Sequence, residues 1–150
     1  PFKRLADAPM GMTAHLAYAA LDNETTPATH SKKIVRDIIR GEIGFDGLLM
    51  TDDLGMKALG GSLADRASRA IAAGVDVILH CSGFVKDPDI VLAEMTEVAG
   101  ASPVLAGDSL RRAKIADAAV HPPKPFDKAE GRERLLKLLS RLSPSSTAVA

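Results

Sequence analysis

The stretch that decides the fold of this chain reads Gly44-Phe45-Asp46-Gly47-Leu48-Leu49-Met50-Thr51-Asp52-Asp53-Leu54-Gly55-Met56. It places a short apolar run between a glycine and a pair of acids, the pattern of a buried strand that ends at the surface. In α/β proteins, functional groups collect at the carboxyl ends of parallel strands. We therefore expect Asp52 and Asp53 to border a functional site, where a carboxylate can act as nucleophile, base or metal ligand.

Two further apolar runs flank this strand, at residues 10–14 and 75–79, and helical patterns separate the three. Ser31 is expected to cap a helix that ends at Gly41. Ser62 and Asp65 are expected to cap a second helix over residues 62–73, which ends at Gly74. Further helices are predicted from Asp87-Pro88 to about 98 and over 106–119 and 129–142, with a polar, frayed tail from 143.

This alternation of strands and helices predicts a parallel sheet covered by helices, the α/β class. Thr13 and Thr51 lie 38 positions apart, and Thr51 and His80 lie 29 apart. A TIM (β/α)8 barrel averages roughly 31 residues per βα unit, whereas a flavodoxin-like domain needs five strands. The spacing favours the C-terminal part of a TIM barrel, with about three βα units over residues 1–120 and a C-terminal helix and flexible tail over 121–150.

Composition excludes several classes of partner. The chain has 19 basic and 19 acidic residues, so its charge gives no reason to expect nucleic acid or a membrane surface. No apolar run approaches the ~20 residues of a membrane span. The one cysteine, Cys81, cannot form an intramolecular disulfide, which favours a reducing, cytoplasmic setting. The start at Pro1-Phe2-Lys3 suggests a fragment of a longer protein.

His15 and His80 follow the two flanking strands, so they could converge with Asp52 at one edge of the sheet. Each histidine could instead be a hydrogen-bonded packing residue, and both acids could be solvated turn residues. Two histidines and an acid could also bind a metal, although their separation is not a local ligand motif. Because adjacent strand residues point to opposite faces, at most one acid can enter a shared site while the strand geometry lasts.

Other residues receive structural interpretations. Gly47 is expected to permit close packing at the narrow end of the barrel, and Gly60-Gly61 to form a flexible turn rather than a phosphate loop. Cys81 is interpreted as a partly buried spectator. Four arginines are interpreted as members of solvated helix faces: Arg66, Arg69, Arg111 and Arg112.

The segment Gly44-Phe45-Asp46-Gly47 through Thr51-Asp52-Asp53-Leu54-Gly55-Met56 resembles the nucleophile strand of family 3 glycoside hydrolases. The resemblance is closest to the bacterial β-N-acetylglucosaminidases that serve peptidoglycan recycling. It extends over roughly residues 1–120, with matching segments at Met12-Thr13-Ala14-His15, Pro27-Ala28-Thr29-His30-Ser31 and Ala72-Ala73-Gly74-Val75-Asp76-Val77-Ile78-Leu79-His80-Cys81.

The resemblance implies a (β/α)8 barrel that hydrolyses terminal β-linked N-acetylglucosamine with retention of configuration. It assigns Asp52 as the nucleophile, and it implies by position that His15 and Met56 line the sugar pocket. The substrate would be a small carbohydrate, an N-acetylglucosaminyl muropeptide. No metal or organic cofactor is implied. The nucleophile must stay ionised, so we expect donors such as Thr51 and backbone amides around it.

The chain departs from the intact family, because neither the acid/base loop nor the family's main sugar-binding residues can be assigned in it. The family's acid/base is a His-Asp pair in a Gly-rich loop of the Lys-His-x-Pro-Gly-His-Gly type, and no such motif occurs in this sequence. We therefore expect the chain to need the N-terminal half of the barrel as its partner and to be inactive alone. Two alternatives stay open, a receiver-like signalling module that binds Mg²⁺ and a non-catalytic barrel remnant.

Overall fold

A computed structural model describes residues 1–81, 83, 85, 87–122 and 125–141. The chain divides into two compact units, residues 1–120 and 121–150, and each is described by itself. The predicted tail from residue 143 lies outside the described residues, as do two residues of the proline-rich segment before the last helix.

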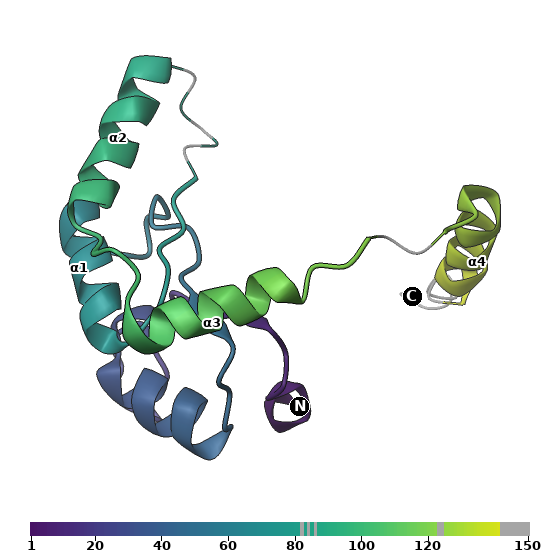
Figure 1. The fold of residues 1–150 in the computed structure, drawn as a ribbon, viewed down its shortest axis with the longest axis horizontal. Helices are drawn as coiled ribbons and strands as arrows, with labels where there is room; N and C mark the ends of the chain where they lie inside the picture. The colour runs from purple at the N-terminus through teal and green to yellow at the C-terminus, as the bar shows by residue number, and fades with distance from the viewer. Residues whose placement is uncertain (82, 84, 86, 123–124, 142–150) are drawn as a thin grey trace, which may run out of the picture. The chain divides into compact units, whose positions relative to one another are not determined.

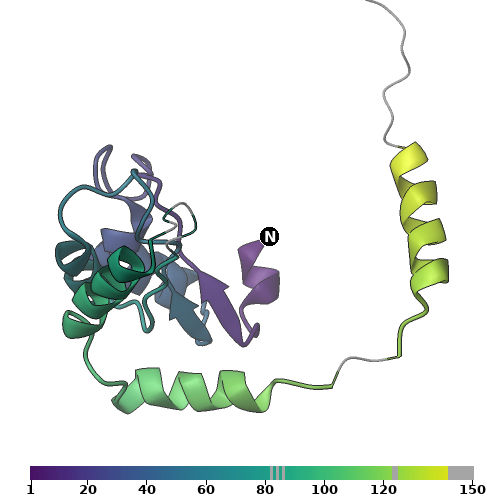
Figure 2. The same cartoon turned by 90° about the horizontal axis from the view of Figure 1, so that it is seen from above.

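The first unit is organised around a short parallel sheet. Strand β1 (Met10–Met12) pairs with β2 (Leu48–Met50), and Met10 lies opposite Leu48. Figure 2 shows the two strands side by side. The third predicted strand, residues 75–79, joins β2 through a parallel bridge between Met50 and Val77. All three apolar runs therefore lie in the predicted parallel order, although hydrogen bonding is regular in only two of them.

Gly47 allows the backbone at the start of β2 to lie close to Ala8 and to the Phe45 ring. A β-carbon at this position would lie 2.3 Å from the carbonyl oxygen of Ala8 and 2.7 Å from the Phe45 ring. Backbone cannot give way as a flexible side chain can, so only glycine fits this site without displacement. The predicted close packing at Gly47 is confirmed.

Helices cover the sheet, as Figures 1 and 2 show. The first unit contains η1 (Phe2–Leu5), η2 (Ala28–His30), η3 (Ile34–Glu42), α1 (Leu63–Ala73), α2 (Pro88–Gly100) and α3 (Gly107–Ala118). The second unit contains α4 (Lys128–Ser140). The predicted helices thus form, each within a few residues of its expected bounds.

The predicted caps at Ser31, Ser62 and Gly74 are confirmed, and Asp87 supplies a further cap at the predicted start of α2. Ser62 accepts from the Asp65 amide in a capping box, and Gly74 ends α1 with a φ of 106°. The Asp87 side chain accepts from the Asp89 amide at the start of α2. Ser31 Oγ accepts from the Ile34 amide at 3.0 Å.

The predicted end of the η3 helix is wrong. Gly41 lies inside this element, which continues to Glu42 with π-type winding, and the Ile43 amide donates to the Ile38 carbonyl. The positive φ of 75° falls at Gly44 instead. The helix thus ends one residue beyond Gly41, and its winding is π-type where the sequence pattern predicts an α-helix.

Apolar residues from several elements form the core. One cluster joins Val35, Phe45, Leu49, Ala70, Ala73 and Val75. A second joins Leu54, Leu59, Ala67 and Val98. The first cluster lies between the sheet, η3 and α1, and the second lies between the loop after β2, α1 and α2. These clusters pack the segment that carries Asp52 and Asp53 against helices α1 and α2.

A network of charged side chains lies at the amino-terminal end of β2 and of the 75–79 run. Asp76, whose side chain is 2% exposed, pairs with Arg40 at 2.6 Å and with Arg112 at 3.1 Å. It also accepts from the Leu49 amide and from the Ser109 hydroxyl. These bonds attach α3 to the start of the sheet.

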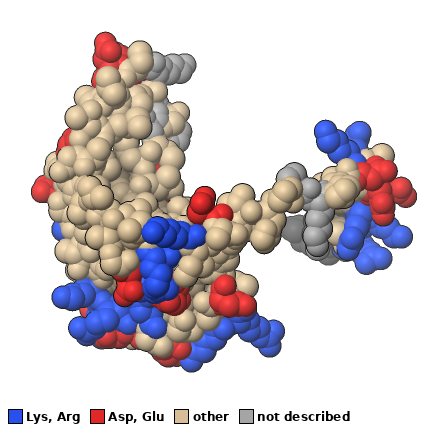
Figure 3. Space-filling model, in the orientation of Figure 1, with Lys and Arg blue, Asp and Glu red and all other residues tan. Residues whose placement is uncertain are grey.

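The interpretation of the four arginines as solvated helix faces holds for Arg69 and Arg111, which are exposed, and is wrong for Arg66 and Arg112, which are partly buried. Arg112 joins buried Asp76 to surface Asp46, and Arg111 also donates to Asp46. Arg66 donates to the Leu54 carbonyl at 2.6 Å, and Arg69 donates to the Gly60 carbonyl. The partners named here lie 9 to 66 positions away in sequence, beyond the reach of a helical pattern. Figure 3 shows acidic and basic side chains together where α3 crosses the first unit.

The first unit is therefore an α/β fold, as predicted. Which portion of a barrel it represents stays a prediction. Within the described residues, no helix has the length and apolarity required to cross a bilayer.

Candidate active site

The carboxyl ends of the three apolar runs meet at one edge of the sheet. The Thr13 amide donates to the Met50 carbonyl at 2.9 Å, and the Thr51 amide donates to the Val77 carbonyl at 3.1 Å. These bonds bring the residues that follow each run, His15, Asp52-Asp53 and His80, into one neighbourhood. The predicted convergence of strand ends is confirmed, but the residue at its centre is Asp53.

Asp53 receives hydrogen bonds from the loops on both sides. Its Oδ1 accepts from the amides of Gly55 at 2.8 Å and Cys81 at 2.9 Å. Its carbonyl oxygen accepts from His15 Nε2 at 2.9 Å and from the Met56 amide at 3.1 Å. One residue thus connects the segments that follow all three runs.

His15 is buried and belongs to a hydrogen-bond network with two threonines. Because a carbonyl can only accept, Nε2 of His15 carries the hydrogen in its bond to Asp53. Nδ1 of His15 lies 2.8 Å from the Thr29 hydroxyl, which also lies 2.9 Å from the Thr13 hydroxyl and donates to the Ala14 carbonyl. Both ring nitrogens are therefore engaged within the chain, which fits the packing alternative for His15.

Asp52 is half-buried, and its surroundings differ from those of Asp53. Its Oδ1 accepts from the Asp53 amide at 2.8 Å, so the predicted backbone donor is present. Thr51 is not the second donor, because its hydroxyl lies between the Leu79 amide and carbonyl. The Asp52 carboxylate is therefore partly accessible and held by a neutral group.

His80 lies between two carboxylates. Its Nε2 is 3.0 Å from Glu94 on α2, and its Nδ1 is 3.6 Å from Asp53 Oδ1. The sequence analysis did not identify Glu94, because it lies 14 positions from His80 inside a helix. The signal that could have found it is an acid on the helix that follows a strand ending in histidine.

Two other predicted residues lie at the surface. Met56 is 44% exposed, so its side chain is accessible to a ligand. Its backbone amide donates to the Asp53 carbonyl in the turn after β2. Cys81 is exposed, and the expectation that it is partly buried is wrong. Its amide is the part that contributes to the strand-end network.

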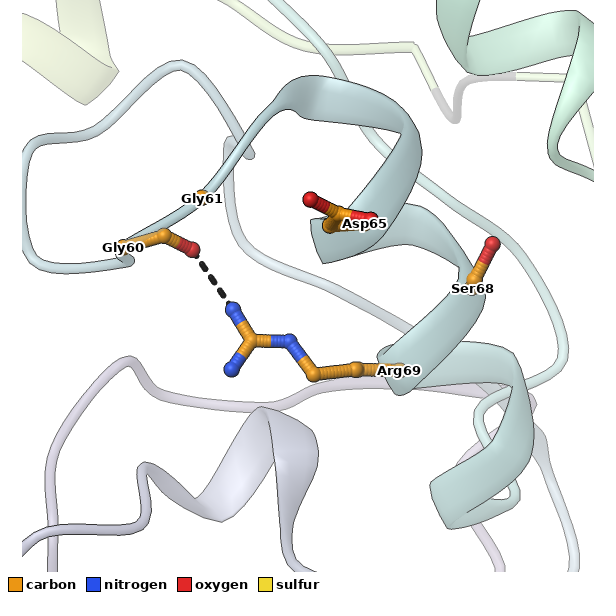
Figure 4. A pocket seen from close by; sticks show the side chains of 5 residues that line it. All are labelled: Gly60, Gly61, Asp65, Ser68 and Arg69. Carbon is orange, nitrogen blue, oxygen red and sulfur yellow. Dashed lines mark hydrogen bonds between the residues drawn. The ribbon is translucent and has the colours of Figure 1, made fainter.

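The described residues contain no group of three histidine, cysteine or acidic side chains arranged to hold a metal ion. A hollow of about 370 Å³ lies elsewhere, at the start of α1, and is lined by Gly60, Gly61, Asp65, Ser68 and Arg69. Figure 4 shows Arg69 reaching across it to the Gly60 carbonyl, with the Asp65 and Ser68 side chains on the helix. This hollow contains none of the strand-end residues.

A partly exposed carboxylate at the end of a parallel strand, next to a buried network that fixes its backbone, defines a site suited to nucleophilic or general-base chemistry. Comparison with known proteins identifies the family. The sequence matches the Glycosyl hydrolase family 3 N terminal domain over residues 1–121. This chain belongs to glycoside hydrolase family 3, whose N-terminal domain has a TIM-barrel-like α/β fold.

A curated relative is the beta-hexosaminidase of Chromobacterium violaceum, 46% identical over 99 residues, which are 63% of this chain and 27% of the relative. The crystal structure of a beta-N-acetylhexosaminidase from Beutenbergia cavernae is similar with a TM-score of 0.57 and 35% identity, over 79% of this chain and 36% of that one. The chain thus spans about a quarter to a third of the length of these proteins.

A second solved structure supports the fold alone. It is a glycoside hydrolase family 3 beta-N-acetylglucosaminidase from Paenibacillus, with a TM-score of 0.63 at 23% identity over 95% of this chain and 30% of that one.

Proposed function

We propose that the protein containing this chain hydrolyses terminal β-linked N-acetylglucosamine with retention of configuration, and that Asp52 is its nucleophile. The observation that carries the proposal is the half-buried Asp52 carboxylate at the carboxyl end of β2, in a chain of this family. The names of the relatives above support the sugar, and the position of Asp52 supports its role.

The proposed reaction has two steps. A carboxylate oxygen of Asp52 forms a bond to the anomeric carbon while the bond from that carbon to the leaving oxygen breaks, and a general acid protonates that oxygen. Water then attacks the same carbon, a base takes its proton, and Asp52 leaves as the carboxylate. Two inversions give net retention.

The general acid and base belong to the part of the barrel outside this sequence. The 150 residues contain no Gly-rich loop of the Lys-His-x-Pro-Gly-His-Gly type. We infer that the chain supplies the nucleophile, that the N-terminal half of the barrel supplies the proton donor, and that the chain alone does not hydrolyse substrate. Met56, with its exposed side chain, is proposed to line the sugar pocket.

The biological substrate is proposed to be an N-acetylglucosaminyl muropeptide, processed in the cytoplasm during peptidoglycan recycling. The balanced charge of the chain gives no reason to expect nucleic acid as a partner, and the names of the relatives support a small carbohydrate. Assays with defined muropeptides and with simple chitooligosaccharides would separate this substrate from other N-acetylglucosaminides.

The test of the nucleophile uses Asp52→Ala in the full-length protein, with hydrolysis of an aryl β-N-acetylglucosaminide as the measurement. We expect kcat to fall by at least about 10³-fold, because the covalent intermediate can no longer form. Added azide should restore turnover, since a small anion can occupy the vacated space and attack the anomeric carbon to give the inverted glycosyl azide.

Asp108→Ala is the control, because this acid lies exposed on α3. It should retain wild-type kcat. An Asp52→Ala protein that hydrolyses substrate within tenfold of the wild-type rate would contradict the assignment. If wild type and Asp108→Ala also lack activity, the result would instead favour the non-catalytic barrel remnant.

A further inference from the structure

We propose that Asp53 is a positioning residue for Asp52, acting through neutral hydrogen bonds rather than through its charge. The proposal rests on the proposed function, since it gives Asp53 a task in the same reaction. It starts from the observation that Asp53 joins the segments following all three apolar runs, whereas the Asp52 side chain accepts, among the described residues, from the adjacent Asp53 amide.

The first step concerns the orientation of the Asp52 carboxylate. The Asp53 amide donates to Asp52 Oδ1 at 2.8 Å. The direction of this N–H is set by the peptide plane between the two residues. Anything that fixes that peptide therefore fixes the carboxylate that must meet the anomeric carbon.

The second step concerns what fixes the backbone of Asp53. Its carbonyl is held by the ring of buried His15, which the buried Thr29 holds in turn. The Asp53 side chain is held by the amides of Gly55 and Cys81. The residue is thus fixed at both its main chain and its carboxylate, from loops on either side of Asp52.

The third step concerns charge. The donors within hydrogen-bond distance of the Asp53 carboxylate are the backbone amides of Gly55 and Cys81. His80 Nδ1 lies farther away, at 3.6 Å, and forms an ion pair with this carboxylate only when the ring is protonated. An amide oxygen in the same place can also accept from these two backbone amides, although less strongly than a carboxylate. The contacts therefore predict that Asn can substitute for Asp at this position and that Ala cannot.

A misplacement of about 1 Å can cost on the order of 10²-fold in rate when reacting atoms must be aligned. We therefore expect Asp53→Ala in the full-length protein to lower kcat about 100-fold with KM within about threefold of wild type. Asp53→Asn should restore kcat to within about tenfold of wild type. The measurement is steady-state hydrolysis of an aryl β-N-acetylglucosaminide by each variant.

Asp65→Ala is the matched control. Asp65 also accepts from a backbone amide, that of Ser62, but at the start of α1. It should lower the thermal midpoint while kcat stays at the wild-type value, which separates loss of stability from loss of positioning.

The outcomes distinguish this proposal from the proposed function. If Asp52→Ala removes activity but Asp53→Ala keeps wild-type kcat, the positioning role is overturned and the nucleophile stands. If Asp53→Asn is as impaired as Asp53→Ala, the charge of Asp53 matters and the neutral role is overturned. If wild-type protein has no glycosidase activity, the proposed function fails first.

Discussion

The two ends of the short parallel sheet each place an aspartate at the centre of a hydrogen-bond network, but they treat its charge in opposite ways. At the amino-terminal end, Asp76 is buried and paired with Arg40 and Arg112. At the carboxyl end, Asp53 accepts from backbone amides, and Asp52 beside it stays half-buried.

The difference separates stability from chemistry. A carboxylate paired with two arginines is a poor nucleophile, because its lone pairs and charge are already engaged. A carboxylate held by a neutral amide keeps its charge available. The sheet thus uses ion pairs where it must hold α3 and neutral donors where a reacting group is proposed.

The largest expected effect on stability is at the amino-terminal end. Asp76→Ala leaves the guanidinium groups of Arg40 and Arg112, 16% and 15% exposed, without their buried partner. Breaking such a buried pair should lower the free energy of unfolding by about 3–5 kcal/mol. Urea unfolding of the full-length protein measures it, and Asp37→Ala, an exposed acid, should leave the midpoint nearly unchanged.

The second prediction probes the neutral network at the carboxyl end. Thr29→Val keeps the side-chain shape but removes the hydroxyl that His15 Nδ1 contacts at 2.8 Å. A buried group left without its partner should cost about 1–3 kcal/mol of unfolding free energy. Thr96→Val, at an exposed helix position, is the control. A loss larger than that of Asp76→Ala would break the contrast between the two ends.

The smallest predicted effect depends on pH. Hydrogen bonds from Arg111 and Arg112 lower the pKa of Asp46 from 3.8 to about 2. The stability from this pair is complete above the unfolded pKa and is lost as pH falls through the folded one. Because Asp46 is 60% exposed, solvent screens the pair, and we expect less than about 1 kcal/mol.

The measurement compares wild type with Asp46→Asn by urea unfolding at about pH 7 and about pH 3. The difference in unfolding free energy should shrink at the lower pH and in high salt. A difference that grows on acidification would show that Asp46 contributes through something other than its ionised form.

Local patterns account for the features that could be predicted from the sequence. The apolar run of β2 and the capping box at Ser62 depend on neighbours a few positions apart, and both formed as expected. The strand-end convergence followed from parallel pairing. The pairing of Arg112 with Asp76 could not be predicted, because only the folded chain brings these two residues together. The pairing of His80 with Glu94 was missed, although an acid on the helix that follows the histidine was a usable signal.

The edge of β1 has a consequence for handling the chain. Within the described part of the chain β1 pairs with β2, and its methionines Met10 and Met12 are 45% and 53% exposed. A strand with a free edge and apolar side chains is a template for pairing with other molecules. When the 150 residues are expressed without the rest of the barrel, we therefore expect concentration-dependent self-association, and solubility becomes a direct readout of whether the missing strands have been supplied.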